Sequence, residues 1–473
     1  MSCVTTTYII LKVEESNYGY EAIRQEIDSR WEAEGTGGAR PRQAEVGAPY
    51  HGSVLMAARI LHGDLFDVLP TLEAESVDAC VTDPPYGLGF MAKDWDVPGG
   101  IGAFPMRRRV ETDAVNTGAS RQGGRQRSCV DFQKRQNRDA QAMQAEAEQW
   151  AREVFRVLKP GAHLVAFGGT RMYHRLTAGI EDAGFEIRDC LSWLYGSGFP
   201  KSLNVGNGQG TGLKPAWEPI VLARKPTVDT VAANVLRHST GALNIEACLL
   251  NPGDVVPGGG NGQASNGGLF GAHETNGTRP LVEPHELGRW PANVLLDETA
   301  AALLDAQSGE LTSGTNPTLR HSDKFRRIFG EFKGSARCNP ARTSDTGGAS
   351  RFFYVAKPSR EERDLGCEHL ETRKRDDGRK KGNPGGDNPR NRGLQLRGNF
   401  HPTVKPLALM RWLVRLVTPT GGLVLDPFGG SGTTGMACAA EGFDFTIIER
   451  EAEYLPIIEA RIRAVAPLFT DTL

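Results

Sequence analysis

Hydrophobic periodicity predicts an alternation of strands and helices, interrupted by two long polar stretches. Short apolar runs typical of buried strands are followed by segments with helical spacing. The predicted strands are 58–64, 77–82, 163–168, 185–196, 220–226, 423–428 and 444–449, and the predicted helices are 65–74, 140–158, 175–184, 407–417, 433–442 and a final one to about 463. This order predicts an α/β fold with a mainly parallel sheet.

The polar stretches divide this α/β pattern into parts. Residues 91–140 are polar and basic without a hydrophobic period, which predicts a mobile loop. Residues 226–399 are rich in Gly and Asn and poor in strand patterns. We therefore predict an N-terminal extension over 1–52, with a strand at 8–13 and a helix near 22–34. An α/β domain follows in two parts, 53–225 and 400–473, around an inserted module at 226–399.

The composition mainly serves to disfavour certain classes of protein and of site. A chain of 473 residues exceeds what one core usually serves, and its 57 Gly and 28 Pro predict long connections. A formal net charge of −2 argues against a protein that coats nucleic acid indiscriminately, so any such contact must come from local clusters. The eight cysteines include no C-x-x-C pair, which favours neither a metal site nor disulfides. Without a membrane-length apolar run or a secretory signal, we expect a cytoplasmic protein.

A glycine loop follows the predicted strand that ends at Asp426. The segment Asp426-Pro427-Phe428-Gly429-Gly430-Ser431-Gly432-Thr433-Thr434 leads from this strand into a helix. Glycine lets the backbone approach a ligand closely, and a helix N-terminus offers free N–H groups to a carboxylate. The next strand ends in Glu449, where an acidic side chain can accept hydrogen bonds from ribose hydroxyls. The pattern suits a nucleoside with a charged tail, although a purely structural glycine turn remains the alternative.

A dinucleotide is the rival ligand for this loop. The G-x-G-x-x-G fingerprint is absent, however. Asp426 would repel a pyrophosphate but attract the ammonium group of a methionine moiety. S-adenosylmethionine is therefore the favoured ligand.

A second candidate site is the tetrapeptide Asp83-Pro84-Pro85-Tyr86, at the end of a predicted buried strand. An exocyclic amino group of a base is a poor nucleophile because its lone pair is delocalised into the ring. The Asp83 carboxylate and the Pro84 carbonyl can accept its two N–H bonds and free the lone pair, and the two prolines stiffen the turn. Tyr86 offers an aromatic plane for a base flipped out of a duplex. A proline-stiffened structural turn is the alternative interpretation.

Together with Gly63-Asp64 and His401-Pro402-Thr403-Val404-Lys405-Pro406, these motifs closely resemble those of DNA amino-methyltransferases of the N6-adenine and N4-cytosine type. The motif order, with D-P-P-Y first and the glycine loop last, resembles the β class. The segments SGFPKSLN, GRWPANVLLD and SRFFYVAKPSREERD also resemble bacterial orphan or phage-associated members. The resemblance implies a Rossmann-like S-adenosylmethionine-dependent methyltransferase fold, with 53–225 and 400–473 as the catalytic domain and 226–399 as the target-recognition region.

The resemblance also implies roles for individual residues. Asp83, Pro84, Pro85 and Tyr86 would be catalytic, Asp426 would meet the methionine ammonium, Glu449 the ribose and Asp64 the adenine of the cofactor. Lys405 could pair with the cofactor carboxylate, or could be an ordinary surface lysine. The remaining cofactor residues implied are Thr403, Pro427, Phe428, Gly430, Ser431, Gly432 and Thr433.

Aspartate at position 83 favours adenine N6, because relatives that act on cytosine N4 more often carry serine there. We expect duplex DNA as substrate, a homodimer, and no metal or membrane partner. Without a visible nuclease domain, a solitary methylase is favoured over a fused restriction enzyme. Basic clusters are the candidate DNA contacts, with solvated loops as the alternative: Arg107, Arg108, Arg109, Arg373, Lys374, Arg375, Lys380 and Lys381.

Two other classes of function compete with this interpretation. Methylases of RNA or of a protein glutamine amide also use such turns, but they usually place the glycine loop ahead of the catalytic turn. A non-catalytic DNA-binding protein on a methylase scaffold is disfavoured by the intact Asp83, Tyr86, Asp426 and Glu449.

Overall fold

The computed structural model describes residues 5–13, 54–87, 129–198, 202, 204–250, 288–312, 346–356, 362–374, 396–465 and 469–470. Its α-helices are α2 (Leu65–Val68), α3 (Cys129–Val157), α4 (Tyr173–Asp182), α5 (Val231–His238), α6 (Glu298–Ser308), α7 (Leu407–Val417), α8 (Thr433–Glu441) and α9 (Leu455–Val465). Short 3-10 turns lie at Leu69–Thr71, Glu246–Cys248, Ala349–Phe352 and Ala452–Tyr454.

The main sheet has eleven strands in the order β12-β9-β5-β8-β4-β3-β15-β16-β2-β1-β17. They are β1 (Thr5–Val13), β2 (Val54–His62), β3 (Val77–Thr82), β4 (Leu158–Phe167), β5 (Glu186–Leu194), β8 (Trp217–Arg224), β9 (Val294–Asp297), β12 (Tyr354–Ala356), β15 (Leu423–Asp426), β16 (Asp444–Glu449) and β17 (Phe469–Thr470). Three two-stranded sheets pair β6 (Asn204–Gly206) with β7 (Gln209–Gly210), β10 (Leu311–Thr312) with β11 (Thr346–Gly347), and β13 (Arg373–Lys374) with β14 (Leu396–Arg397).

The centre of this sheet is parallel and the flanks are mixed. β4, β3, β15, β16 and β2 run parallel to one another, while β8 lies antiparallel between β4 and β5 and β1 lies antiparallel beside β2. From β3 the chain crosses to β4 on one side, and from β15 it crosses to β16 on the other side. The two crossovers therefore diverge between β3 and β15. Ligands bind at such a switch point, outside the carboxyl ends of the strands.

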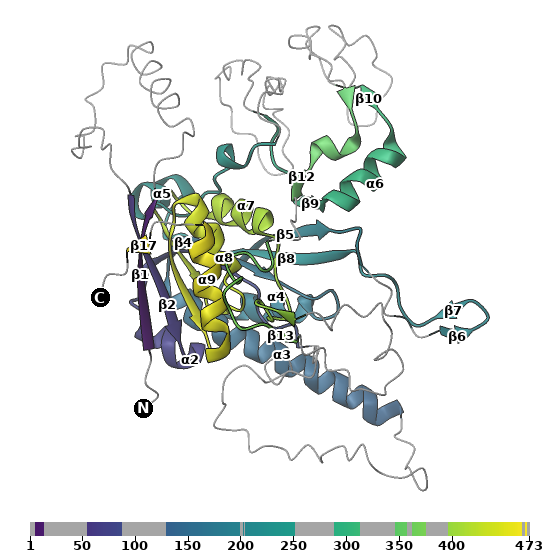
Figure 1. Ribbon diagram of the computed structural model, residues 1–473, viewed down its shortest axis with the longest axis horizontal. Coiled ribbons are helices and arrows are strands. Elements are labelled where there is room, and N and C mark those ends of the chain that lie inside the picture. The colour runs from purple at the N-terminus through teal and green to yellow at the C-terminus, as the bar shows by residue number, and fades with distance from the viewer. Residues whose placement is uncertain are drawn as a thin grey trace, which may run out of the picture.

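Helices cover both faces of the sheet (Figure 1). On one face α3 contributes Trp150, Ala151 and Val154 to a core with strand residues such as Cys80 and Leu164. On the other face α7, α8 and α9 pack together. Burial on both faces explains why the parallel strands form continuous apolar runs in the sequence.

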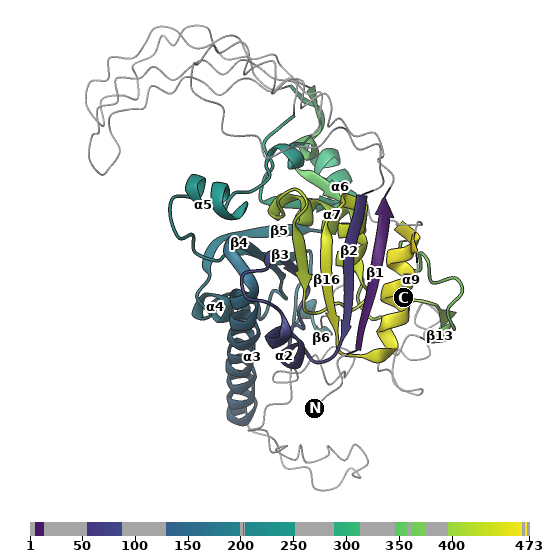
Figure 2. The ribbon, with the colours of Figure 1, turned by 90° about the vertical axis from the view of Figure 1, so that its left-hand side faces the viewer.

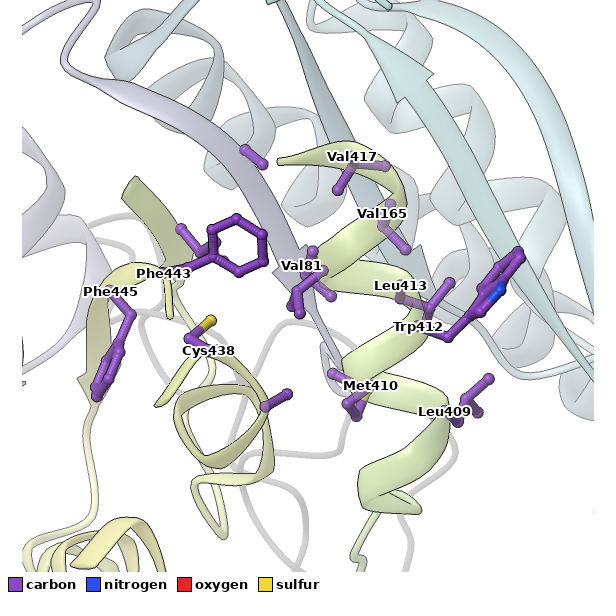
Figure 3. Packing of buried hydrophobic residues seen from close by; sticks show 14 of the residues in the cluster. Val81, Val165, Leu409, Met410, Trp412, Leu413, Val417, Cys438, Phe443 and Phe445 are labelled. Atoms are coloured by element: carbon purple, nitrogen blue, oxygen red, sulfur yellow. The ribbon is translucent and has the colours of Figure 1, made fainter. Parts of the chain in front are cut away.

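Helix α7 shows how the second face is held (Figure 3). Its apolar stripe, which includes Leu409, Leu413 and Val417, packs in the same cluster as Val81 of β3 and Val165 of β4. Each fully buried side chain of this size contributes roughly 2 kcal/mol of transfer free energy. This packing fixes β3, which leads into Asp83, and the segment that enters α7, which carries Thr403 and Lys405.

The structure confirms the predicted α/β fold and corrects some details. The prediction of a loop over 91–140 is wrong from residue 129, because α3 begins at Cys129. Residues 129–138 are mainly polar, so hydrophobic periodicity could not reveal the helix. The predicted helix at 22–34 and residues 91–128 lie outside the described residues.

The two segments assigned to separate modules contribute strands to the main sheet. β1, from the N-terminal 52 residues, pairs along its full length with β2 (Figure 2). β9 and β12, from the inserted region, pair with each other, and β9 also pairs with β5. At these edges the extension and the insertion are thus continuous with the α/β sheet.

Candidate functional site

Four acidic residues meet at the carboxyl edge of the parallel strands. Asp83 follows β3, Asp426 ends β15, Glu449 ends β16, and Asp64 follows β2. All four line one cavity of about 1380 Å³. The sequence separates Asp83 from Asp426 by more than three hundred residues, and the parallel pairing of β3 with β15 brings them together.

The D-P-P-Y turn presents Asp83 between a phenol and an ammonium group. Tyr86 donates its hydroxyl to Asp83 Oδ1 at 3.0 Å, and Lys405 Nζ donates to Asp83 Oδ2 at 2.6 Å. The Tyr86 ring lies so close to Gly169 that a β-carbon there would be 3.0 Å from the ring edge. Burial, then the negative charge of Asp83, raises the pKa of Tyr86 well above its usual value. The phenol is therefore a neutral donor.

Lys405 lies against the D-P-P-Y turn. Its Nζ is 3.2 Å from the Tyr86 hydroxyl and 3.5 Å from Glu218 Oε2, and the side chain is 10% exposed. Burial alone lowers the pKa of this ammonium group, but the carboxylates of Asp83 and Glu218 outweigh burial and raise the pKa. It contacts these groups of the turn and of β8, so it is not a surface lysine.

Asp426 is buried beneath the glycine loop and accepts three hydrogen bonds. Oδ1 accepts from the Thr82 hydroxyl at 2.6 Å and from the Phe428 N–H at 3.0 Å, and Oδ2 accepts from the Thr434 hydroxyl at 2.6 Å. Burial raises its pKa to about 6, although the three donors oppose the shift. These contacts fix the carboxylate at the floor of the cavity.

Glu449 ties the end of β16 to the loop. Its Oε2 accepts from the Gly430 N–H at 2.6 Å, and its Oε1 accepts from the Glu451 N–H at 2.7 Å. Burial raises the pKa of Glu449 to about 7, against the effect of these two donors. The carboxylate is thus held in one orientation and titrates near neutral pH.

Glycine is required at several positions of the loop. Gly430 has φ 54°, in the left-handed region, and a β-carbon there would lie 3.2 Å from the buried His401 ring. A β-carbon at Gly429 would lie 2.3 Å from Ile447. The loop therefore packs closely on Ile447 of β16 and on His401.

The predicted cofactor residues lie around the same cavity with one exception. Asp64, Thr403, Lys405, Pro427, Phe428, Gly430, Ser431 and Thr433 line it together with Asp426 and Glu449. Gly432 does not line the cavity. It has φ 75° and packs on Ile458, where a β-carbon would approach to 3.0 Å. Its contribution is to the turn of the loop into α8.

Two residues at the site carry no motif that sequence reasoning could use. Arg461 of α9 is fully buried and donates to the Ser431 carbonyl at 2.6 Å and to the Thr433 hydroxyl at 2.9 Å. Glu218 stands at the start of β8 and lines the cavity. Helical spacing places Arg461 on the same face as Ile457 and Ile458, and this position on the apolar face was its only signal. Glu218 precedes Pro219, just before the predicted strand 220–226, and this position was the only sign of its role in the sequence.

Among the predicted DNA contacts, the structure describes Arg373 and Lys374, in β13. Arg373 lies 3.4 Å from Glu453 and stacks its guanidinium 5.0 Å from the Phe400 ring. The other predicted contacts, Arg107, Arg108, Arg109, Arg375, Lys380 and Lys381, lie outside the described residues.

The described part of the insertion also carries exposed aromatic and basic side chains. Trp290 is 71% exposed, and Phe352 lies between the guanidinium groups of Arg289 and Arg351, at 4.9 and 4.3 Å. Within the described residues we find no cluster of His, Cys, Asp or Glu suited to a metal ion. No helix in this part of the chain has the length and apolar character that a membrane crossing needs.

The sequence profile of a family described as DNA methylase, the N6/N4 methylases, matches residues 77–460, most of the chain. This protein belongs to the N6/N4 DNA methylase family. The D-P-P-Y turn and the glycine loop both fall within the matched region.

Individual relatives match parts of this DNA methylase. The type II methyltransferase M.HindIII of Haemophilus influenzae is 27% identical over 203 residues, which cover 39% of this chain and 64% of that protein. The type II methyltransferase M2.MboI of Moraxella bovis is 40% identical over 71 residues, 15% of this chain and 26% of that protein. The matches therefore span less than two thirds of either relative.

Among solved structures, the cytosine-N4-specific PvuII DNA methyltransferase is 14% identical, with coverage of 85% of this chain and 86% of that chain and a TM-score of 0.41. The M1.HpyAVI complex with SAM is 15% identical and has a TM-score of 0.32. The match covers 85% of this chain and 98% of that chain. Because these identities and TM-scores are low, the function of this DNA methylase is inferred from its own site.

Proposed function

We propose that this protein transfers a methyl group from S-adenosylmethionine to adenine N6 in duplex DNA, with the target base flipped out of the helix. One observation carries the proposal. The Asp83-Pro84-Pro85-Tyr86 turn and the glycine loop with its two buried carboxylates line a single cavity. Its volume, about 1380 Å³, exceeds the roughly 300–1,000 Å³ of a pocket for one drug-sized ligand. There is room for a nucleoside-like cofactor and a base together.

The donor set fits S-adenosylmethionine. A carboxylate offers about four lone-pair positions, and the contacts of Asp426 use three of them, which leaves one for an ammonium group. Glu449 uses two, which leaves two for ribose hydroxyls. A dinucleotide would instead place its pyrophosphate beside buried carboxylates. Asp64, Thr403 and the lining residues of the loop would complete the cofactor site.

The residues around Asp83 suit an exocyclic amino group. When bound, the cofactor supplies an electrophilic methyl group on a sulfonium. Asp83 and the Pro84 carbonyl accept the two N–H bonds of the target and direct its lone pair to the methyl group. Lys405 and Tyr86 each hold one oxygen of Asp83, so its orientation is fixed before the base arrives. The Tyr86 ring offers the stacking surface that the base loses on leaving the duplex.

Adenine is proposed over cytosine because position 83 is aspartate. The same geometry can treat cytosine N4, which is the second outcome of the test below. We also propose that the inserted region reads the target sequence and that the protein acts as a homodimer. Light scattering that shows a monomer with full activity per chain would contradict the dimer.

The test is methyl transfer from labelled S-adenosylmethionine to duplex DNA, RNA and protein supplied separately. Long-read sequencing of DNA from a methylation-free host that expresses the chain then gives the modified base and its target. We expect label in duplex DNA and a modified adenine in a fixed sequence context. Label confined to RNA or protein would contradict the proposal.

A further inference from the structure

Lys405 lies between two carboxylates, of which the proposed chemistry uses one. Its Nζ is 2.6 Å from Asp83 Oδ2 and 3.5 Å from Glu218 Oε2. Asp83, Lys405 and Glu218 are 24%, 10% and 23% exposed as side chains. They come from the turn after β3, the segment before α7 and the start of β8. All three residues line the cavity.

Glu218 is poised to accept a proton. Its Oε2 is buried and has no hydrogen-bond partner, since the approach of Lys405 is longer than a hydrogen bond usually is. Burial raises the pKa of Glu218, Lys405 opposes this shift, and the negative charge of Asp83 supports it. A buried carboxylate with only this long contact at its Oε2 binds a proton more readily than a solvated one does.

Methyl transfer to an amino nitrogen creates a proton that must leave. The lone pair of the nitrogen forms the N–CH3 bond while the carbon–sulfur bond breaks and its electron pair stays on sulfur. The nitrogen then carries a positive charge and two protons, and one N–H bond must break. Asp83, which accepts that N–H in the proposed function, receives the proton first.

We propose that Lys405 and Glu218 form a relay that carries this proton away from Asp83. Lys405 passes one Nζ proton to Glu218 Oε2 and takes the new proton from Asp83. Asp83 is again a carboxylate, Lys405 again an ammonium, and Glu218 a neutral acid whose proton leaves to solvent. The inference rests on the proposed function and adds to it the fate of the proton.

The charges around the relay favour uptake of the proton. Two carboxylates and one ammonium give the group a net charge of −1 before transfer, and the arriving proton brings it to zero in a buried site. The other titratable groups that face Glu218 are Tyr86 and Tyr195, both with pKa values raised first by burial. Asp426 and His401 face Asp83 from the glycine loop and the segment before α7. Burial lowers the pKa of His401 to about 4, so it is neutral.

The alternative is that Lys405 acts only as a fixed positive charge and that Glu218 only positions it. Arginine separates these roles, because its guanidinium keeps the charge but does not give up a proton in proteins. We therefore compare K405R and K405M with E218Q and E218A. E181Q, an exposed glutamate of α4, is the control. Single-turnover methyl transfer to duplex DNA is measured against pH, with cofactor affinity measured by calorimetry.

We expect E218Q to lower the single-turnover rate at least about tenfold, as loss of general base catalysis does. The acid limb of its rate–pH profile should move to lower pH, because one group that must be ionised for activity is gone. K405R should lose as much rate as K405M. Acetate, but not chloride at equal ionic strength, should restore part of the rate of E218A. The cofactor affinity of E218Q and E218A should stay within about twofold of the wild type.

A K405R or E218Q enzyme that keeps its rate within twofold of the wild type would overturn the relay. So would an E218Q enzyme with the pH profile of the wild type, or an E218A enzyme that acetate does not restore. These outcomes leave the proposed function standing. Failure of the wild type to methylate DNA would instead contradict the proposed function itself.

Discussion

At the scale of single residues, Asp83 and Asp426 have different roles in the same cavity. Asp83 faces the proposed amino group, whereas Asp426 lies under the cofactor loop. We predict that Asp83→Ala lowers methyl transfer by at least about 10³-fold, because it removes the acceptor that orients the target nitrogen. Cofactor affinity, measured by calorimetry, should change little. Glu181→Ala, at an exposed position of α4, is the control. Turnover within tenfold of the wild type would refute the assignment of Asp83.

Asp426 and Glu449 predict how cofactor binding depends on pH. Their pKa values are raised to about 6 and about 7, so both carboxyls become neutral as the pH falls through this window. An ammonium group is attracted only by the ionised form of Asp426. Affinity for S-adenosylmethionine should therefore fall as the pH drops from 8 to 5.5, and Asp426→Asn should bind more weakly with a flatter profile. Equal affinity across this range in the wild type would exclude Asp426 from the site.

The same shifts have a consequence for stability. The ordinary pKa values of these carboxyls are 3.8 and 4.5, and both are higher in the folded protein. At pH values between the ordinary and the raised pKa of each carboxyl, the folded state therefore binds more protons than the unfolded state. The contribution of both groups to stability is full at pH below 4 and is lost as the pH rises through 6 to 7. Bound cofactor opposes that loss by pairing with the ionised carboxyls.

Sequence reasoning could place Asp83, Asp426 and Glu449 because each ends a recognisable strand beside a distinctive motif. It could not give the partners of Lys405, since its contact with Asp83 joins positions 322 residues apart. Glu218 and Arg461 were missed because their local signals, a following proline and a place on the apolar face of a helix, do not show what a buried charge contacts. Burial is set by packing among distant elements, which a single sequence does not reveal.

At the scale of elements, α9 supports the cofactor loop through Arg461. This guanidinium donates to the Ser431 carbonyl and the Thr433 hydroxyl, and its NH2 group donates to the Glu362 carbonyl. Burial lowers its pKa to about 10, so it stays charged at neutral pH. Removal of the donor leaves buried acceptors unsatisfied.

We predict that Arg461→Met lowers the free energy of unfolding by about 2–4 kcal/mol, since each unsatisfied buried group costs about 1–3 kcal/mol. It should also weaken cofactor binding, because Ser431 and Thr433 lose their support. Arg463→Met, at an exposed position two residues on, is the matched control and should have a small effect. Chemical denaturation of both variants measures the difference. Equal stability of both would contradict a supporting role for Arg461.

Element prediction worked best where hydrophobic periodicity was strong, as in α7 and β15. It failed for the start of α3 at Cys129, where the sequence is polar, and for the sheet edges. The pairing of β12 with β9, for example Tyr354 with Leu295, depends on chain segments about sixty residues apart. Short edge strands carry too few residues for a pattern to identify their partners.

At the scale of the whole molecule, the inserted region and the catalytic cavity must act on the same DNA. We predict that alanine at Arg375, Lys380 and Lys381 together weakens DNA binding and flattens its dependence on salt. Each lost phosphate contact reduces the slope of log affinity against log salt by about 0.9. Alanine at the exposed Glu246 and Glu310 provides the control. An unchanged slope would mark these basic residues as solvated side chains away from the phosphates.

The central claim is that this site methylates an adenine amino group in DNA, and one measurement tests it directly. The purified protein is incubated with unmethylated genomic DNA and S-adenosylmethionine that carries a deuterated methyl group. The DNA is then digested to nucleosides for mass spectrometry. We predict labelled N6-methyldeoxyadenosine with the wild type and none with Asp83→Ala. Labelled N4-methyldeoxycytidine alone would contradict the choice of base, and the absence of any labelled nucleoside would contradict the account as a whole.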